Sequence, residues 1–367
     1  MSNYYIGLLS GTSVDSIDAA LMTIDEDNID IVCTHEQNFS AQLKSELQNI
    51  IKSQSITLEQ LSNTDSLLAF EFSQAIDILI SKSNITKSKI IAIGSHGQTI
   101  YHQPNGNHTN TIQIGSAHMI AAITGIKVVN NFRNLDMAYG GQGAPLAPLI
   151  HKRLFANNDK NTAVINLGGI ANISFIGKDY PHPIGFDVGP ANCLIDEWIH
   201  IHKNLDFDEA GNWAKQGQLN KTLLSQMLND DFFHKPVPKS TGREYFNHHW
   251  YDNFIEQFKL TQANDIQTTL THLVAASIAN TIKLQQYKVD EMILIGGGAK
   301  NSYLVNLISQ YSSLNVTNAN NYGYDGDWIE AILFAFLAYK RINNTTLDLN
   351  SFTGSSKPIL IGDIVEC

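Results

Sequence analysis

The sequence predicts an α/β protein made of two similar lobes. Its 367 residues suffice for two domains, because a typical domain holds about 150 residues. Segments with strand-like and helix-like patterns alternate along the chain, which is typical of α/β folds. A strand, a glycine turn and a second strand open the chain at residues 6–23, and the same pattern returns at 162–175. This repeat, about half a chain apart, favours an ancestral duplication.

The first half begins with strands and continues with helices. Residues 6–9 form a short apolar run and residues 17–23 alternate between apolar and polar, which predicts two strands joined by a glycine turn. Apolar residues recur at helical spacing over 41–52 and 58–80. The other elements expected here are strands at 29–33, 90–93, 112–114 and 127–130, and a helix at 117–123.

The second half repeats this alternation around a predicted insertion. We expect strands at 163–167, 170–175 and 292–295, and helical or helix-bearing segments at 187–200, 267–286, 303–310 and 328–341. Residues 206–249, rich in polar and aromatic side chains, are expected to form an irregular insertion. We place the domain boundary between residues 1–130 and 131–367, and the C-terminal helix is a candidate to cross back to the first domain.

Composition and charge exclude several classes of protein. Apolar residues make up 43% of the chain and charged residues 16%, which indicates a folded globular protein. With 24 Lys and Arg against 35 Asp and Glu, the net charge is −11, which argues against nucleic acid and anionic membranes as partners. The three cysteines lack a CxxC spacing, and the N-terminus lacks the basic start of a signal peptide. The longest apolar run, 332–339, is too short for a bilayer, so we expect a cytoplasmic protein.

Three glycine-rich strand ends are candidate phosphate-binding turns. Backbone N–H groups freed by glycine turns can surround phosphate oxygens, and carboxylates beside them can hold Mg²⁺ directly or through water. The first candidate loop comprises Gly11, Thr12, Ser13, Val14, Asp15, Ser16, Ile17 and Asp18, with Asp15 as a magnesium ligand. The other two candidates are Gly168 with Gly169, and Gly296 with Gly297 and Gly298. An ordinary hairpin turn is the alternative for the first loop, and the chain has no Walker A motif.

A carboxylate near a predicted strand end is the candidate general base. Asp187 stands in the run Gly-Phe-Asp-Val-Gly-Pro, after a predicted strand and before a predicted helix. A rigid strand would fix the position of this carboxylate while the open end of the strand admits a substrate. Helix capping or a hydrogen bond within a turn is the alternative role.

A glycine-rich polar loop is a candidate substrate site. Arg133 is suited to pair with a carboxylate, and Gln142 can bond to sugar hydroxyls. The alternative is an internal salt bridge between Arg133 and Asp136. His96 follows another predicted strand, where a histidine is more often structural than catalytic, and Glu330 interrupts an apolar helical stripe. The histidines lack zinc-binding spacing, so we expect no zinc site.

Together, these motifs resemble those of the anhydro-N-acetylmuramic acid kinases, a branch of the sugar kinase, actin and heat-shock ATPase superfamily. The matching segments follow the family's order and are 10–18, 94–99, 132–145, 166–172, 185–192, 240–244, 296–301, 327–335 and 353–354. The resemblance implies a two-lobed, duplicated actin-like ATPase fold of the ribonuclease H-like kind, with a central cleft. It implies an enzyme that uses ATP and Mg²⁺ to open the 1,6-anhydro ring of 1,6-anhydro-N-acetylmuramic acid with water and to phosphorylate O6. The products would be N-acetylmuramate 6-phosphate and ADP, in peptidoglycan recycling.

The resemblance also implies roles for individual segments. Residues 11–18 would form the ATP phosphate loop, Asp187 would be the catalytic base, and 296–298 would lie on the adenosine side. The expected substrate or phosphate contacts are His96, Arg133, Gln142 and Glu330. Because members of the family form homodimers, we expect a homodimer. Two alternatives are a kinase of the same fold for a plain hexose or amino sugar, and a sugar-binding regulator without activity.

Overall fold

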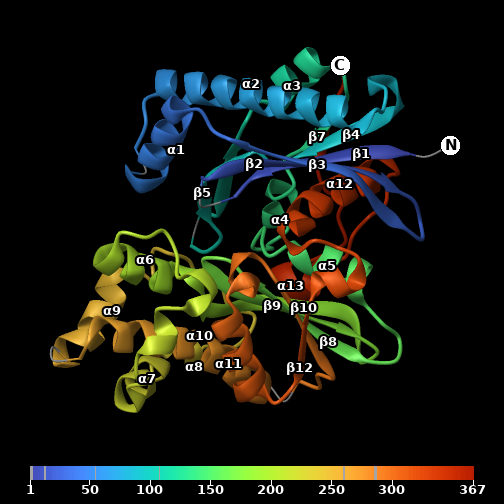
Figure 1. The fold of residues 1–367 in the computed structure, drawn as a ribbon. Coiled ribbons are helices and arrows are strands. Elements are labelled where there is room, and N and C mark those ends of the chain that lie inside the picture. Colours follow the sequence, from blue (N-terminus) through green and yellow to red (C-terminus); the bar gives the residue numbers. More distant parts are fainter. Residues whose placement is uncertain (1–2, 12–13, 54, 107, 259–260, 285–286) are drawn as a thin grey trace. The chain divides into compact units, whose positions relative to one another are not determined.

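The chain folds into two compact units (Figure 1). The computed structural model describes residues 3–11, 14–53, 55–106, 108–258, 261–284 and 287–367. The first unit consists of Met1–Ile150 and Trp328–Cys367, and the second of His151–Asp327. This division places residues 131–150 in the first unit, beyond the predicted boundary after residue 130, and the C-terminal helix, the predicted candidate to cross back, packs on the N-terminal sheet.

A six-stranded mixed sheet forms the centre of the first unit. Its strands are β1 (Tyr4–Ser10), β2 (Ser16–Ile24), β3 (Ile29–Asn38), β4 (Ile90–Ser95), β7 (Val128–Asn130) and β13 (Asp363–Val365). They lie in the order β13-β7-β4-β1-β2-β3. β1 runs antiparallel to β2 and parallel to β4, so the C-terminal ends of β1 and β4 lie at the same edge. A separate hairpin pairs β5 (Gln98–Gln103) with β6 (Asn110–Ile114).

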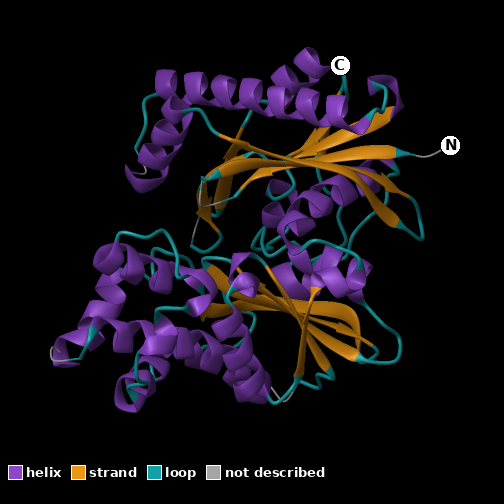
Figure 2. Cartoon of the chain, viewed as in Figure 1, coloured by secondary structure: helices purple, strands orange, loops and turns teal. Residues whose placement is uncertain are grey.

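Helices cover both faces of this sheet, as Figures 1 and 2 show. These helices are α1 (Ala41–Ser53), α2 (Leu58–Ser83), α3 (Ala117–Thr124) and α12 (Ile329–Ile342). The first unit also contains α4 (Asn134–Ala138), which contacts the hairpin strand β6, and the short α13 (Asn350–Thr353). On one face, strand residues such as Ile6 and Leu8 pack against α1, α2 and α3. On the other face, Gly7 and Gly94 let α12 approach closely, because a Cβ at either position would collide with a carbonyl oxygen of that helix. This close approach fixes α12 on β1 and β4.

The second unit repeats the strand arrangement of the first. Its strands are β8 (Asn161–Leu167), β9 (Ile170–Gly177), β10 (Tyr180–Pro190), β11 (Glu291–Ile295) and β12 (Asn315–Asn318). They form a sheet of order β10-β9-β8-β11-β12, in which β8 is antiparallel to β9 and parallel to β11. The relation of β8 to β9 and β11 therefore matches that of β1 to β2 and β4, which supports the predicted duplication.

The insertion between β10 and β11 is more regular than predicted. The helices of the second unit are α6 (Asn192–Lys203), α7 (Lys221–Leu228), α8 (Asp231–His234), α9 (His248–Ile255), α10 (Ala263–Leu284) and α11 (Ser302–Ser312). The helix α5 (Ala147–Phe155) carries the chain into this unit. Side chains of α6, α7, α9 and α10 share an apolar core that includes Trp198, Leu223 and Tyr251. Phe232 and Phe246 of the predicted insertion are buried in this core, whereas Phe207 is exposed.

The predicted α/β class is confirmed, with differences at short elements. The long helices and the buried strands occur where their patterns predict them. The predicted helical segment from 187 starts too early, because β10 continues to Pro190 and α6 begins at Asn192. None of the helices in the described ranges combines the length and the apolar character needed to span a membrane.

Candidate active site

The first predicted phosphate loop connects β1 to β2. Gly11 and Val14 close it, since the Val14 N–H donates to the Gly11 carbonyl over 3.1 Å. Val14 is buried and has a φ of 56°, a left-handed conformation that is strained for a β-branched residue. Backbone strain of this kind is concentrated at functional sites. The predictions for Thr12 and Ser13 fall outside the described residues.

The remaining residues of this loop differ in exposure. Ile17 is part of the core, whereas Asp15 is exposed and its carboxylate lies 3.7 Å from the Lys44 ammonium. Ser16 donates through Oγ to Asp18 over 3.2 Å. Within the described ranges, no group of three or more His, Cys, Asp or Glu could hold a metal ion. A magnesium ion at Asp15 would therefore take most of its ligands from phosphate and water, as is usual for this ion.

His96 and Arg133 form a polar pair just beyond the end of β4. Arg133 Nη2 lies 3.0 Å from His96 Nε2, and Arg133 Nη1 donates to the Gly143 carbonyl over 2.6 Å. Because a guanidinium only donates, His96 Nε2 accepts and the ring proton resides on Nδ1. Burial, and then the charge of Arg133, lower the pKa of His96 well below its usual range. Burial lowers the pKa of Arg133 to about 10, so this guanidinium remains charged at neutral pH.

Asp136 organises the glycine-rich loop beside this pair. Its carboxylate accepts from the Gly143 N–H over 2.6 Å and from Thr353 Oγ1 over 2.6 Å. The Gln142 N–H donates to the Thr353 carbonyl over 2.8 Å, which ties the loop to α13. Asp136 therefore holds the loop, rather than forming the alternative salt bridge with Arg133.

Glu330 lies in the first turn of α12 with an exposed side chain. Packing in the core does not explain a glutamate at this position, which agrees with the sequence, where Glu330 interrupts an apolar helical stripe. Its charge raises the pKa of Arg133, against the larger effect of burial, so the two side chains attract each other. Loss of solvation raises the pKa of Glu330, and the charge of Arg133 acts in the opposite direction.

The other glycine segments meet at one end of the sheet in the second unit. Gly168 and Gly169 form the turn between β8 and β9, and the Gly168 carbonyl accepts from the Asn192 N–H over 3.0 Å. This contact joins the turn to the start of α6. Gly298 packs on the same strand end, because a Cβ there would come within 2.7 Å of Leu167 Cβ. Gly296, with a φ of 77°, bends the chain there.

Gly297 differs from its neighbours because it has free space around it. The nearest atom to a Cβ built there is the Asn192 amide nitrogen, 4.0 Å away. The packing of the protein itself therefore does not require glycine at this position. Glycine also lets a ligand approach the backbone closely, and this reason would account for glycine at this position.

Asp187 lies inside β10, near its end, rather than after the strand. Its Oδ2 accepts from the Thr241 N–H over 2.9 Å and from Ser240 Oγ over 3.1 Å, and its own N–H donates to the Lys239 carbonyl over 2.9 Å. Burial raises the pKa of Asp187 to about 6, although these two donors favour the ionised form. A carboxylate that is held in place and titrates near neutral pH can act as a general base.

The resemblance includes residues 240–244 of the loop that holds Asp187, but no role was assigned to these residues or to Lys239 from the sequence. Lys239 is buried, and its ammonium donates to the Phe232 carbonyl over 2.9 Å. Farther along, Arg243 covers the first glycine turn of this unit, because a Cβ on Gly169 would lie 2.8 Å from Arg243 Nε. The signal that could have found both residues is the run Lys-Ser-Thr-Gly-Arg-Glu, which places two cations beside hydroxyls in a segment expected to be irregular.

The structure thus gathers the predicted residues into one set in each unit. The first unit holds the described part of the first loop with His96, Arg133, Gln142 and Glu330. The second unit holds Asp187, Gly168, Gly169, Gly296, Gly297 and Gly298. Most of these residues lie at strand ends and turns, where a rigid sheet can position polar groups, whereas Glu330 lies in the first turn of α12.

Comparison with known proteins identifies similar sequences over nearly the whole chain. The sequence profile described as anhydro-N-acetylmuramic acid kinase matches residues 3–366. The protein of that name from Coxiella burnetii (strain Dugway 5J108-111) is 41% identical over 362 residues, covering 98% of this chain and 96% of that protein. The one from Haemophilus influenzae is 40% identical over 375 residues, covering 98% and 97%.

A solved structure supports the fold. Component A of (R)-2-hydroxyglutaryl-CoA dehydratase from Acidaminococcus fermentans has a TM-score of 0.51 at 10% identity, covering 93% of this chain and all of that chain. At such low identity the likeness shows the fold alone, and the predicted actin-like ATPase fold is confirmed.

Proposed function

Because the chain belongs to the anhydro-N-acetylmuramic acid kinase family, whose members are ATP-dependent sugar kinases, we propose that it acts on 1,6-anhydro-N-acetylmuramic acid. It opens the anhydro ring with water and transfers the γ-phosphoryl group of ATP to O6. The products are N-acetylmuramate 6-phosphate and ADP, and the reaction serves peptidoglycan recycling. The observation that carries the proposal, beside family membership, is the carboxylate of Asp187, held by two donors and with a pKa of about 6.

We assign to Asp187 the proton transfer of this reaction. Its carboxylate accepts a proton from the water that attacks the anomeric carbon, and the opening bridge leaves negative charge on O6, which then attacks the γ-phosphoryl group. One base therefore serves both ring opening and phosphorylation. Ser240 Oγ and the Thr241 N–H keep the carboxylate in one orientation while the proton moves.

The loops supply the electrostatic part of catalysis. We assign phosphate contacts to the loop 11–18 and to the Gly168–Gly169 turn, and adenosine contacts to 296–298. Magnesium, held at Asp15 through its water ligands, neutralises charge on the phosphates when it is bound. The fit rests on the exposure of Asp15 and on the preference of Mg²⁺ for one or two carboxylates together with phosphate.

We assign the substrate's lactyl carboxylate to Arg133. Its guanidinium stays charged although it is partly buried, and its position is fixed by the Gly143 carbonyl and His96. A fixed guanidinium loses less conformational entropy when it binds a carboxylate. Gln142 and Glu330 are assigned to the sugar hydroxyls. We further propose a homodimer in solution, which light scattering of the purified chain tests directly.

The test is an ADP-release assay in ¹⁸O-labelled water. The substrate panel contains 1,6-anhydro-N-acetylmuramic acid, N-acetylglucosamine and glucose. The proposal expects ADP release with the anhydro sugar and one ¹⁸O atom at the anomeric carbon of the product. Phosphorylation without label at that carbon would contradict the coupled hydrolysis. Release with glucose alone would favour a hexose kinase, and no release with any sugar would favour a sugar-binding regulator.

A further inference from the structure

Arg243 has no role in the function proposed above, although it lies beside a turn assigned to phosphate. It belongs to the second unit, as do Gly169 and Asp187. A Cβ on Gly169 would lie 2.8 Å from Arg243 Nε and 2.9 Å from Nη2, so the guanidinium lies directly against this glycine turn. The arginine therefore occupies the space that a side chain at position 169 would need.

The guanidinium of Arg243 is available to a ligand. The residue is exposed, and its backbone carbonyl accepts from Asn247 Nδ2 over 3.3 Å. Within the described ranges, the guanidinium itself has no hydrogen bond and no ion pair. Its N–H donors form a planar fork that matches two oxygens of a phosphate group. Binding a phosphate would therefore break no hydrogen bond of this side chain to the described chain.

One face of α6 lies close to this guanidinium. Cys193 and Asp196 are three residues apart on that helix, so their side chains share a face. Burial raises the pKa of both groups, to about 7 for Asp196, and the charge of Arg243 acts in the opposite direction on both. The carboxylate of Asp196 therefore attracts the guanidinium toward the helix that follows the glycine turn.

The loop that carries Arg243 also holds the candidate base. Ser240 Oγ and the Thr241 N–H donate to the carboxylate of Asp187. Thr241 is two residues from Arg243, so their Cα atoms are at most about 7 Å apart. One short loop thus brings a cation close to a base. Phosphoryl transfer uses this combination, because the base serves the attacking oxygen while a cation neutralises charge on the transferred group.

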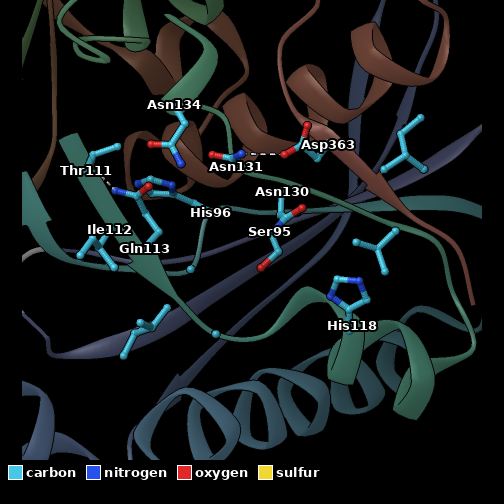
Figure 3. A pocket seen from close by; sticks show the side chains of 15 residues that line it. Ser95, His96, Thr111, Ile112, Gln113, His118, Asn130, Asn131, Asn134 and Asp363 are labelled. Atoms are coloured by element: carbon cyan, nitrogen blue, oxygen red, sulfur yellow. Dashed lines mark hydrogen bonds between the residues drawn. The ribbon is translucent and has the colours of Figure 1, made fainter. Parts of the chain in front are cut away.

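The pocket in the first unit does not offer such a cation. Figure 3 shows this pocket, which has a volume of about 420 Å³. None of the 15 described residues that line it is Lys or Arg, and Asp363 contributes a carboxylate. A phosphate would gain no charge-assisted hydrogen bond from a lysine or arginine of its wall, whereas Arg243 can supply one or two.

We propose that Arg243 is a catalytic residue whose guanidinium binds the terminal phosphoryl group of ATP, and that Asp196 positions this guanidinium over the Gly168–Gly169 turn. The inference rests on the proposed function. As O6 forms its bond to the γ-phosphorus, the bond from that phosphorus to the β,γ-bridging oxygen breaks, and its electron pair leaves with ADP. Arg243 neither gains nor loses a proton, and its N–H groups stabilise charge on the non-bridging oxygens.

The first experiment measures nucleotide binding to the full-length chain without sugar. Calorimetric titrations with Mg²⁺ use β,γ-methylene-ATP and ADP as probes. Arg243→Gln should weaken binding of the ATP analogue about tenfold to 100-fold, because one or two charge-assisted hydrogen bonds are lost. ADP affinity should stay within about twofold. Equal weakening of both nucleotides would place the contact on the inner phosphates, and that result or unchanged analogue affinity would overturn the proposal.

The second experiment measures turnover with the anhydro sugar. Arg243→Gln should lower kcat about 10³-fold, as expected for a cation on the transferred group. Arg243→Lys should recover only part of this loss, since an ammonium cannot bind two oxygens as a planar fork does. The matched control is Lys235→Gln, which removes another exposed cation of the same loop and should change neither kcat nor analogue affinity more than about twofold. Equal losses in both Gln variants would indicate net charge rather than contact, and would overturn the proposal.

Asp196→Asn separates positioning from simple charge. At pH 8 this carboxylate is ionised, because its pKa is about 7. Loss of a negative charge near a phosphate would by itself strengthen binding of the ATP analogue. If Asp196 holds Arg243 in place, binding should instead weaken about threefold to tenfold, and this loss should vanish when Arg243→Gln is also present. Stronger binding in Asp196→Asn would overturn the positioning role.

The outcomes distinguish this inference from the proposed function. Selective weakening of the ATP analogue in Arg243→Gln, in a chain that phosphorylates none of the sugars, would overturn the proposed function and support the phosphate contact. Phosphorylation of the anhydro sugar with kcat retained within about threefold in Arg243→Gln would overturn the inference alone. An unchanged melting temperature of the variant, expected for an exposed side chain, shows that the losses do not come from unfolding.

Discussion

Among single residues, Asp187 carries the strongest expected effect on turnover. Asp187→Asn keeps the size of the side chain and removes the base, so kcat should fall by about 10²-fold to 10⁴-fold. Nucleotide affinity should be largely retained, because the assigned phosphate contacts lie elsewhere. The control is Asp179→Asn, an exposed carboxylate at the start of β10, for which we expect unchanged turnover. A fall of less than about threefold in Asp187→Asn would remove this residue from the role of base.

The pKa of Asp187 predicts opposite effects of acid on activity and on stability. Burial raises this pKa to about 6, so kcat/KM should fall about tenfold per pH unit below pH 6 as the base becomes protonated. The ordinary value is about 3.9. The folded state therefore binds this proton more tightly than the unfolded chain, and the resulting stabilisation is fully present below about pH 4 and lost as the pH rises through 6.

Two measurements from pH 4 to 8 separate these effects. Steady-state kinetics should give the apparent pKa of kcat/KM, and urea unfolding of the parent chain and Asp187→Asn should give the difference in stability. That difference should change between pH 4 and 6 and stay constant above pH 7. An apparent pKa for kcat/KM below 5 would contradict the assignment of Asp187.

At the scale of elements, the loop that follows α8 depends on one buried ammonium. Lys239 donates to two backbone carbonyls over 2.9 and 3.2 Å and lies 4.5 Å from the centre of the Phe232 ring. Lys239→Met should leave both carbonyls unpaired and cost about 1–3 kcal/mol of stability. It should also move the apparent pKa of kcat/KM upward, because the donors to Asp187 follow directly in the chain.

Lys235→Met is the control in the same loop. Lys235 is exposed and lies 5.6 Å from the centre of the Phe232 ring. Its replacement should change stability by no more than about 0.5 kcal/mol. Denaturant unfolding and a pH profile of kcat/KM on both variants make the comparison. A stability loss in Lys239→Met with an unchanged pH profile would limit Lys239 to a structural role.

The close packing of α12 on the first sheet predicts that a larger residue at Gly94 destabilises the protein. Gly94→Ala would place a methyl group against the Phe334 carbonyl oxygen, and a helix backbone cannot yield as a flexible side chain can. We expect a loss of about 3 kcal/mol or more in denaturant unfolding. In the control Gly326→Ala, the nearest atom to the new methyl lies 3.5 Å away, so stability should change little. Equal stability of both variants would show that α12 is not held as closely as described.

The length and burial of an element decided whether its pattern could be predicted. α2 spans many turns, and both its period and its capping pair Thr57 and Gln60 can be seen in the sequence. β13 has three residues, too few for any periodicity. In β10 the register shifts between Asp187 and Gly189, so the alternation expected of a strand is broken where the base lies.

The candidate site was predictable where it depends on local sequence. Glycine turns and the carboxylate of Asp187 follow from residue type and neighbours. The role of Arg243 depends on its contact with Gly169, which is distant in sequence and is set by tertiary packing. The role of Lys239 depends on the fold of an irregular loop, which brings its ammonium to the carbonyl of Phe232. The unpaired hydroxyl of Ser95 is likewise invisible in a sequence, because only the structure shows that nothing bonds to it.

At the scale of the whole molecule, the first unit is built from two separated chain segments, with the second unit inserted between them. Deleting residues 328–367 removes α12 and β13 and uncovers the face of β1 and β4 that carries Gly7 and Gly94. The first unit should then lose its slow hydrogen exchange, because one face of its sheet is no longer packed. The second unit keeps all its segments and should remain protected.

Deleting only residues 363–367 is the matched control, since it removes the edge strand β13 and leaves α12 in place. Exchange should then quicken in β7, the sole strand paired with β13 within the described sheet, and stay slow in β1 and β4. Mass spectrometry of both deletions resolves these segments. Slow exchange of β1 after the long deletion would mean that the sheet is stable without α12. The C-terminal segment would then not be needed for the stability of the first unit. Fast exchange in both units would instead mean that they fold as one cooperative body.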